Sequence, residues 1–163
     1  MMVIDGLGNG GAERQLCLLS RSLPPAWAAC VWSLDGGRYE QELRDAGVPT
    51  RVCRRRFRTD LGPVLDLAGH VRRQKPDVIH SWSWMSACAA EIVSRVFRVP
   101  HVAGLIRRGT LPPRRTRRAV LATKLGARVL ANSQAGLEAD GVPIWRGRVL
   151  HNGFDGSRLA QCA

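Results

Sequence analysis

The sequence predicts an α/β fold: a doubly wound, mostly parallel, Rossmann-like sheet of about seven strands with helices on both faces. Three observations support it. Short apolar segments alternate with longer segments of helical spacing along the 163 residues, a pattern typical of parallel sheets. A glycine-rich loop follows the first apolar segment. Polar residues and glycines gather directly after the apolar segments, where such sheets bind their ligands.

The first part of the chain contains the pattern in its clearest form. Residues 2–4 are apolar and predict a strand, residues 6–11 form the glycine-rich loop, and residues 12–23 have the apolar spacing of a helix. Pro24 and Pro25 end that helix. The next expected elements are a strand over 28–34, a helix over 39–46 capped by Gly47, and a strand over 48–53.

The same alternation continues to the end of the chain. A helical face over 61–73 precedes a buried-type strand over 77–81, and a helix over 85–97 precedes a strand over 101–106. A basic helix over 113–125, a strand over 128–131, a short helix over 134–139 capped by Asn132 and Ser133, and a strand over 148–150 complete the prediction. The order of the strands in the sheet does not follow from the sequence.

Size and composition predict one cytoplasmic domain with a substantial core. No run approaches the roughly 20 apolar residues of a membrane span, and the first residues lack the features of a secretory signal. The five cysteines are scattered without a C-x-x-C pair, which predicts reduced and packed thiols. They are Cys17, Cys30, Cys53, Cys88 and Cys162.

The charge of the chain is strongly positive, with 25 Lys and Arg against 13 Asp and Glu and a formal net charge of +12. Arginines cluster at residues 51–58 and 114–118. This surplus predicts attraction to sugar nucleotides, anionic lipid head groups or nucleic acid; the alternative is an arginine-rich solvated face. We do not expect nucleic acid as the partner, because the sequence has no helix-turn-helix, zinc or RNP-type pattern and a single tyrosine for stacking.

The loop at residues 6–11 is the strongest local signal for ligand binding. Glycines let the backbone approach a ligand, and the following helix N-terminus offers free N–H groups to an anion such as phosphate. The absence of G-K-[ST] excludes a P-loop NTPase, and a dinucleotide fingerprint is unpersuasive because Asp35, the nearest acidic candidate, has an equally good explanation in the turn beside Gly36. A turn that only packs the helix on the strand remains the alternative.

Two further strand exits carry candidate side chains. His80 ends a buried-type strand, and as a residue that titrates near neutrality it can orient a hydroxyl or act as a general base; a hydrogen-bonded histidine at the sheet edge is the alternative. Trp82 and Trp84 can form a stacking wall for a sugar ring or cover the following helix. Arg107 and Arg108 suit bidentate pairing with phosphate or carboxylate. No catalytic triad motif or metal-ligand spacing is present.

Four segments together resemble the N-terminal domain of family 4 retaining glycosyltransferases, which have the two-Rossmann-domain B-type fold. They are residues 10–14 (GGAER), 75–81 (KPDVIHS), 131–133 (ANS) and 152–155 (NGFD), and the resemblance spans essentially the whole chain. It implies that residues 1–155 are the acceptor-side domain and residues 156–163 the start of an interdomain linker. The C-terminal donor-binding domain would then be absent from this sequence.

The resemblance also implies roles for single residues. The candidate catalytic residues are His80 and Arg107. The residues implied to bind the donor phosphates and sugar are Gly10, Gly11, Asn152 and Gly153. The residues implied on the acceptor side are Glu13, Arg14, Ser81, Trp82 and Arg108. One departure concerns the exit of the strand over 101–106, where many relatives have a histidine and this chain has Ile106 and Arg107.

The expected function is therefore half of a retaining glycosyltransferase that moves a sugar from a nucleotide-sugar donor to a hydroxyl of a lipid-linked or polysaccharide acceptor. We expect the chain alone to be inactive and the reaction to need no obligatory metal or other cofactor. The arginine clusters favour peripheral contact with the inner face of an anionic membrane. The alternative function is a non-catalytic Rossmann-like module that binds a phosphate-bearing ligand.

Overall fold

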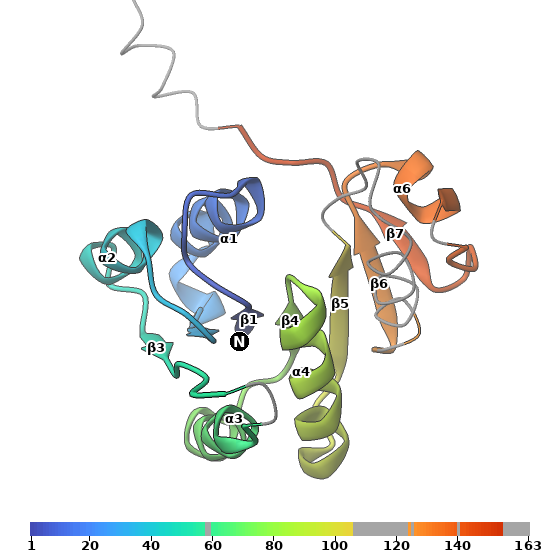
Figure 1. The fold of residues 1–163 in the computed structure, drawn as a ribbon. Helices are drawn as coiled ribbons and strands as arrows, with labels where there is room; N and C mark the ends of the chain where they lie inside the picture. Colours follow the sequence, from blue (N-terminus) through green and yellow to red (C-terminus); the bar gives the residue numbers. More distant parts are fainter. Residues whose placement is uncertain (58–59, 106–123, 125, 140, 155–163) are drawn as a thin grey trace, which may run out of the picture.

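The computed structural model describes residues 1–57, 60–105, 124, 126–139 and 141–154, and within them seven strands form one parallel sheet (Figure 1). The strands are β1 Met2–Ile4, β2 Val31–Ser33, β3 Thr50–Val52, β4 Ile79–Ser81, β5 His101–Leu105, β6 Arg128–Ala131 and β7 Gly147–Val149. The α-helices are α1 Gly11–Ser22, α2 Arg38–Asp45, α3 Gly62–Gln74, α4 Trp84–Phe97 and α6 Gln134–Ala139. The predicted fold class is confirmed.

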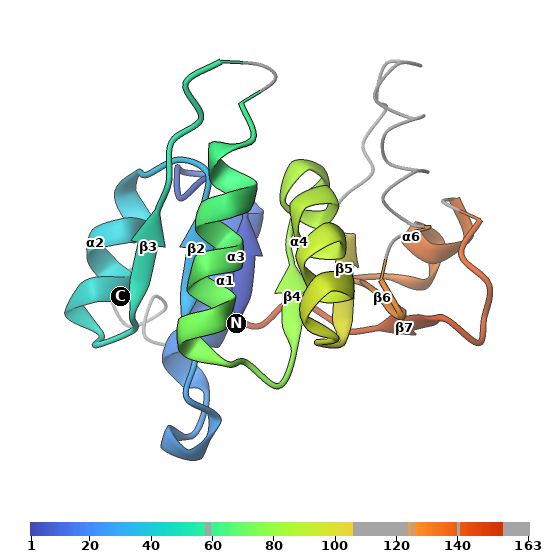
Figure 2. The same cartoon turned by 90° about the horizontal axis from the view of Figure 1, so that it is seen from below.

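The strand order is β3-β2-β1-β4-β5-β6-β7. The chain first winds outward from β1 through β2 to β3, then crosses back to β4 beside β1 and winds in the other direction. Right-handed crossovers therefore put α1 and α2 on one face and α3 and α4 on the other, as Figures 1 and 2 show. The reversal between β1 and β4 is the topological switch point of a doubly wound sheet.

Most predicted elements occur within one or two residues of their expected bounds, but several strands are shorter than expected. The clearest case is the expected strand over 28–34, of which only Val31–Ser33 pairs in the sheet. Pro25–Trp27 instead forms a 3-10 turn after the proline pair, with the N–H of Trp27 donating to the carbonyl of Pro24 at 2.9 Å. The basic helix expected over 113–125 falls almost entirely outside the described residues.

Each face of the sheet has its own apolar core. On one face, Ile4 and Val31 of the sheet pack with Leu16 of α1 and Leu43 of α2. On the other face, Val3 and Trp32 of the sheet pack with Leu67 of α3 and with residues of α4. Alternate residues of β1 thus enter opposite cores, and for this reason the strand is apolar at every position.

The four cysteines within the described residues are free thiols, as expected. Cys17 and Cys30 are buried, and burial raises the pKa of both thiols above the ordinary value. The neutral thiol is therefore the stable form of each, consistent with a packing role. Cys162 lies outside the described residues.

Helix α3 provides a matched test of the second core. Leu67 is fully buried, whereas Leu65, two residues earlier on the same helix, is 72% exposed. We predict that Leu67→Ala lowers the free energy of unfolding by about 2–5 kcal/mol, because it removes a packed side chain and leaves a cavity. Leu65→Ala should change it by about 0.5 kcal/mol or less. Urea denaturation followed by circular dichroism measures both, and equal effects would contradict this packing of α3.

Candidate functional site

A cavity of about 300 Å³ lies at the carboxyl ends of the strands, on the face of the sheet that also carries α1. We call it the carboxyl-edge pocket. Its lining consists of Gln15, Leu18, Leu19 and Ser22 from α1, His80, Trp82, Gly104, Leu130, Ala131 and Asn132 from β4 to β6 and their exits, and Leu150, His151, Asn152, Gly153 and Phe154 after β7. A mostly apolar pocket of this size with a few polar groups is typical of small-molecule sites.

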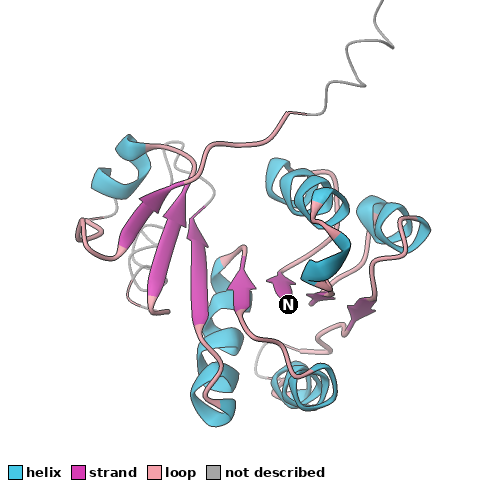
Figure 3. Ribbon diagram, turned by 180° about the vertical axis from the view of Figure 1, so that it is seen from behind, coloured by secondary structure: helices cyan, strands magenta, loops and turns pink. Residues whose placement is uncertain are grey.

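The winding of the sheet explains why the pocket lies here. Helices α1 and α2 pack over β1, β2 and β3, at one end of the sheet (Figure 3). The strands β4 to β6 continue the same face beyond α1. Residues 150–154 leave β7 and run back toward α1, as Figure 1 shows. The pocket therefore lies between α1, the exposed strand ends and this returning segment.

Strand register decides which side chains face the pocket. His80 of β4 pairs with Met2 of β1 and with Val102 of β5, so its side chain shares the α1 face with the side chain of Met2. Gly104 lies two residues beyond Val102 and faces the same side. A side chain at Gly104 would lie 3.2 Å from Nε2 of His80 at its Cβ atom. The glycine thus leaves room for the imidazole at the floor of the pocket.

His80 is held in its neutral form. Burial, with a smaller contribution from the nearby His101, lowers the pKa of His80 to about 4. The expectation of a pKa near neutrality was therefore wrong, because it ignored the cost of charging an imidazole at a buried strand end. A base of such low pKa is a weak proton acceptor at pH 7. Of the two roles expected from the sequence, the structure favours the orientation of a hydroxyl by hydrogen bonding.

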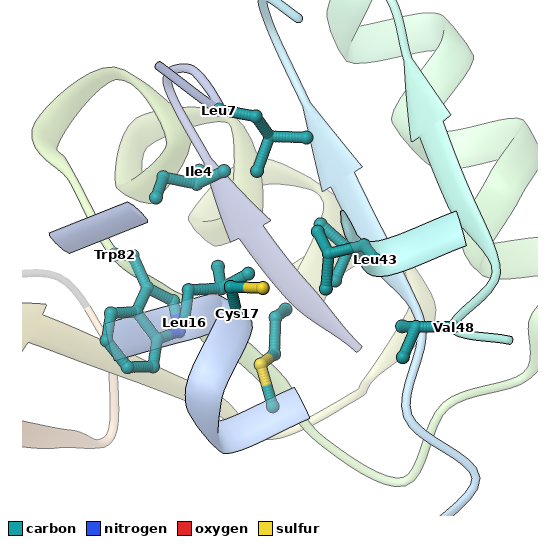
Figure 4. Close-up of a cluster of buried hydrophobic side chains, with 9 residues drawn as sticks. Ile4, Leu7, Leu16, Cys17, Leu43, Val48 and Trp82 are labelled. Carbon is teal, nitrogen blue, oxygen red and sulfur yellow. The ribbon is translucent and has the colours of Figure 1, made fainter. Parts of the chain in front are cut away.

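Trp82 forms part of both the pocket and the core. Its ring centroid lies 4.8 Å from that of His80 at an interplanar angle of 40°, and its side chain is only 9% exposed. Figure 4 shows Trp82 packed beside Ile4 and Leu16 in the core under α1. Its indole N–H is buried without a hydrogen-bond partner among the described residues. Trp82 therefore supports the histidine and leaves only an edge for contact with a ligand.

Ser81, expected on the acceptor side, points to the opposite face of the sheet. It is fully buried, and its hydroxyl lies 2.9 Å from Nε2 of His101. The other ring nitrogen of His101 lies 2.8 Å from the carboxylate of Glu91, which also accepts the N–H of Gly126 at 2.7 Å. This network joins β4, α4, β5 and the turn before β6. In this arrangement the hydroxyl of Ser81 does not reach the pocket, because adjacent strand residues point to opposite faces.

A residue that the sequence analysis did not single out closes the pocket. The side-chain amide of Gln15 donates to the carbonyl of Gly153 at 2.9 Å and accepts the N–H of Gly153 at 2.8 Å. This pair of hydrogen bonds, here called the Gln15 clamp, joins residues that are 138 positions apart. Gln15 is 8% exposed. The sequence contains one signal for Gln15. It is a polar residue in the stripe that residues 15, 18, 19 and 22 form on an amphipathic helix.

The glycine-rich loop lies apart from the carboxyl-edge pocket, whose lining contains neither Gly10 nor Gly11. Gly10 is the N-cap of α1. The carboxylate of Glu13, in the first turn, lies so close to Gly10 that a side chain at Gly10 would collide with it. A negative group therefore already occupies the positive end of the helix dipole.

Arg14 lines a second cavity of about 250 Å³, here called the arginine pocket, which lies between α1 and α2. Arg21 and Arg38 also line it and share the carboxylate of Glu42, at 3.7 and 3.5 Å. Arg14 makes no ion pair among the described residues. The two pockets share Gln15, Leu18, Gly153 and Phe154, so the Gln15 clamp lies in the wall between them.

The remaining candidates have different outcomes. The structure brings His80, Trp82, Asn152 and Gly153 together in one pocket. Arg107 and Arg108 lie outside the described residues. The carboxylate of Asp35 accepts hydrogen bonds from the N–H of Gly36 at 2.9 Å and from Nε of Arg54 at 3.1 Å. The contact with Gly36 is the turn role that the sequence suggested. Within the described ranges, no three His, Cys, Asp or Glu side chains gather in an arrangement that could hold a metal ion.

Comparison with known proteins gives one family and a set of related folds. The sequence profile of Glycosyltransferase Family 4 matches residues 9–158. The structure of Anabaena Alr3699/HepE in complex with UDP and glucose has a TM-score of 0.72 and 26% identity, and the match covers 99% of this chain and 48% of that protein. A search of curated proteins found no match.

More distant structures have the same fold. A glycosyltransferase from Rickettsia africae ESF-5 has a TM-score of 0.69 at 16% identity, covering 99% of this chain and 48% of that one. The lipopolysaccharide outer core galactosyltransferase WaaB has a TM-score of 0.69 at 12% identity, covering 94% and 46%. The chain thus spans about half the length of the solved structures that it matches.

The low pKa of His80 makes a testable contribution to stability. As pH falls through the unfolded value of about 6.5, the unfolded chain binds a proton, whereas folded His80 stays neutral until about pH 4. The contribution of His80 to the free energy of unfolding is therefore full above pH 6.5 and decreases as the pH falls toward 4. Between pH 7 and pH 5, wild type should lose roughly 2 kcal/mol more unfolding free energy than His80→Gln. Equal losses in urea denaturation would contradict the burial of His80.

The Gln15 clamp can be tested by hydrogen exchange. We predict that Gln15→Leu speeds exchange of the Gly153 amide by about tenfold or more and lowers the unfolding free energy by about 1 kcal/mol, because both hydrogen bonds are lost to water. Gln134→Leu is the matched control, since Gln134 donates a hydrogen bond to Glu138 in an exposed i,i+4 pair. Unchanged protection of Gly153 in the Gln15 variant would show that the clamp does not hold the returning segment.

Proposed function

The chain belongs to glycosyltransferase family 4, and from this membership we propose that it is the acceptor-side domain of an enzyme that transfers a sugar from a nucleotide-sugar donor to a hydroxyl group. The carboxyl-edge pocket is the observation that carries the proposal. It combines an apolar wall with a neutral histidine at the edge where doubly wound sheets bind ligands. The acceptor is lipid-linked or a polysaccharide, and the transfer retains the anomeric configuration.

His80 has a positioning task in this proposal. An acceptor hydroxyl in the carboxyl-edge pocket donates a hydrogen bond to the neutral imidazole, which directs the hydroxyl oxygen toward the donor sugar. The bond from this oxygen to the anomeric carbon forms, the bond from that carbon to the leaving diphosphate breaks, and the hydroxyl proton passes to an oxygen of the departing diphosphate. Gly104 keeps the space above the imidazole open. Proximity and orientation of this kind provide a large part of the rate enhancement in enzymes.

The donor side of the proposal involves the loop before α1 and the returning segment. Gly10 and Gly11 approach the donor phosphates through their backbone, and Asn152 and Gly153 face the sugar from the other side of α1. The Glu13 carboxylate beside Gly10 must turn away when the donor binds, since two anions at one helix end repel each other. We propose no obligatory metal for this reaction.

The whole reaction needs a second domain in this proposal. The match to the Anabaena protein, whose structure contains UDP and glucose, covers 48% of that protein. We propose that the 163-residue chain binds the acceptor but is inactive alone. None of the described helices has the length and apolar character to cross a membrane. We propose a cytoplasmic location with peripheral contact to the inner face of an anionic membrane.

A second candidate function is a non-catalytic module that binds a phosphate-bearing ligand. The arginine pocket favours it, because three guanidinium groups there face a single carboxylate, that of Glu42. Arginine is suited to bidentate contact with phosphate. Tight binding of inorganic pyrophosphate that is abolished by Arg14→Gln, without transfer activity in any longer form of the protein, would favour this alternative.

Activity assays distinguish the two candidates. We predict that the 163-residue chain does not release UDP from UDP-glucose with any sugar acceptor, whereas the chain extended by a family 4 donor domain does. In the extended protein, His80→Ala should lower kcat/KM by about a hundredfold, a typical effect of losing an orienting group. Ile144→Ala, at an 85% exposed position before β7, is the control and should change nothing. Turnover by the short chain would contradict the proposed division of labour.

A further inference from the structure

Three large apolar side chains are exposed near the start of α3. Phe57 is 61% exposed, Leu61 is 70% exposed and Leu65 is 72% exposed. Leu61 is the N-cap of α3 and Leu65 follows one helical turn later, so the two leucines share one face of the helix. Single exposed apolar residues are common on protein surfaces. Three within nine positions form a local apolar patch, and such a patch indicates an interaction surface.

The loop before α3 holds this patch away from the core. The carboxylate of Asp60 accepts the N–H of Arg56 at 2.9 Å and the N–H of Gly62 at 2.8 Å. The N–H of Asp60 donates to the carbonyl of Phe57 at 3.2 Å. These bonds fold the described part of the loop into a turn. Figure 2 shows that the described residues between β3 and residue 57 extend beyond the ends of the strands.

The charges around the patch are positive and only partly compensated. Arg51 pairs with Asp66, and Arg54 pairs with Asp35. Arg55 contacts the sulfur of Met85 at 3.5 Å. Neither Arg55 nor Arg56 has an ion pair with a carboxylate in the part of the chain that the structure describes. The carboxylate of Asp60 interacts electrostatically with both arginines, so two guanidinium groups share one carboxylate beside the exposed leucine and phenylalanine side chains, in a chain with a net charge of +12.

We propose that Phe57, Leu61 and Leu65, together with Arg55 and Arg56, form a docking surface for an anionic lipid bilayer. The apolar side chains enter the head-group region while the guanidinium groups contact lipid phosphates. Nucleic acid fits less well, because the two leucines have no favourable contact with a phosphodiester backbone. Phe57 is the one aromatic side chain of this surface, whereas sites for single-stranded nucleic acid stack successive bases on several aromatic side chains. The bilayer as partner rests on the proposed peripheral contact, whereas the position of the surface rests on its exposure and charge.

The docking surface and the carboxyl-edge pocket lie at the same edge of the sheet. Phe57 follows β3, and His80 occupies the end of β4, and in a parallel sheet all strands end at one edge. A bilayer on the docking surface therefore contacts the edge of the sheet that carries the pocket, although from the α3 face and not from the α1 face. This geometry favours the lipid-linked class among the two acceptor classes of the proposed function.

Vesicle co-sedimentation tests the docking surface without any need for transfer activity. The probes are vesicles of phosphatidylcholine alone and of phosphatidylcholine mixed with phosphatidylglycerol, at low and high salt. We expect wild type to bind only the mixed vesicles. Leu61→Ser with Leu65→Ser should reduce binding about tenfold at both salt concentrations. Arg55→Gln with Arg56→Gln should reduce binding about tenfold at low salt and weaken its salt dependence.

Controls keep the result interpretable. Serine is a favoured N-cap residue, so the change at Leu61 leaves α3 able to form, and thermal melting checks that the variant is folded. Ile144→Ser with Trp145→Ser removes two other exposed apolar residues, 85% and 65% exposed, which precede β7 at the opposite edge of the sheet. This control should bind vesicles as wild type does. An equal loss of binding in the control would overturn the proposed position.

Two other outcomes would also overturn the proposal. The first is unchanged vesicle binding by the Leu61 and Leu65 double variant. The second is a wild-type protein that binds neither vesicle type but forms a dimer, while the same double variant is a monomer. That result would assign the patch to contact with a second copy of the chain. Neither result bears on transfer by the extended protein with a water-soluble acceptor, so failure of the docking surface is distinguishable from failure of the proposed function.

Discussion

The pairing of β1 with β4 is the constraint on which the site depends. Because the chain reverses its winding at this pair, α1 and α2 cover β1 to β3, whereas the crossovers after β4 place their described helices on the other face. The α1 face of β4 to β6 is thereby left for the carboxyl-edge pocket. The same pairing sets Met2 beside His80, so one row of side chains passes from the core under α1 directly into the pocket.

The pocket is completed by a contact between the two ends of the described chain. Strand register brings His80 and Gly104 to one face, but the pocket also needs a wall opposite the strands. The Gln15 clamp provides it by holding Gly153 against α1 through both of its backbone groups. A Cβ atom at Gly153 would approach Leu18 to 3.2 Å, so glycine also allows the segment to lie this close to the helix. The Gln15 clamp thus lies in the wall between an apolar pocket and an arginine-lined one.

The sequence predicted the elements well because apolar periodicity and the turn residues are local signals. The positions of Pro24, Gly47 and Ser133 set element ends that the structure confirms, with the hydroxyl of Ser133 accepting the N–H of Gly136 at 3.1 Å. Strand order and side-chain direction are not local. The sequence therefore placed Ser81 on the acceptor side, although alternation turns it to His101, and it gave His80 an ordinary pKa that burial lowers. The Gln15 clamp was missed because its partner is 138 residues away.

In the proposed function, the start of α1 holds two anions in turn. Without a ligand, the carboxylate of Glu13 lies over Gly10 and neutralises part of the positive end of the helix dipole. A donor diphosphate carries more charge than one carboxylate and can accept several backbone N–H groups at once, so it competes effectively for the same position. In the proposed function, Glu13 is released in this exchange and then accepts hydrogen bonds from sugar hydroxyls on the acceptor side. The helix stabilisation that the structure shows and the acceptor contact that we propose are compatible, because they belong to different states of the same site.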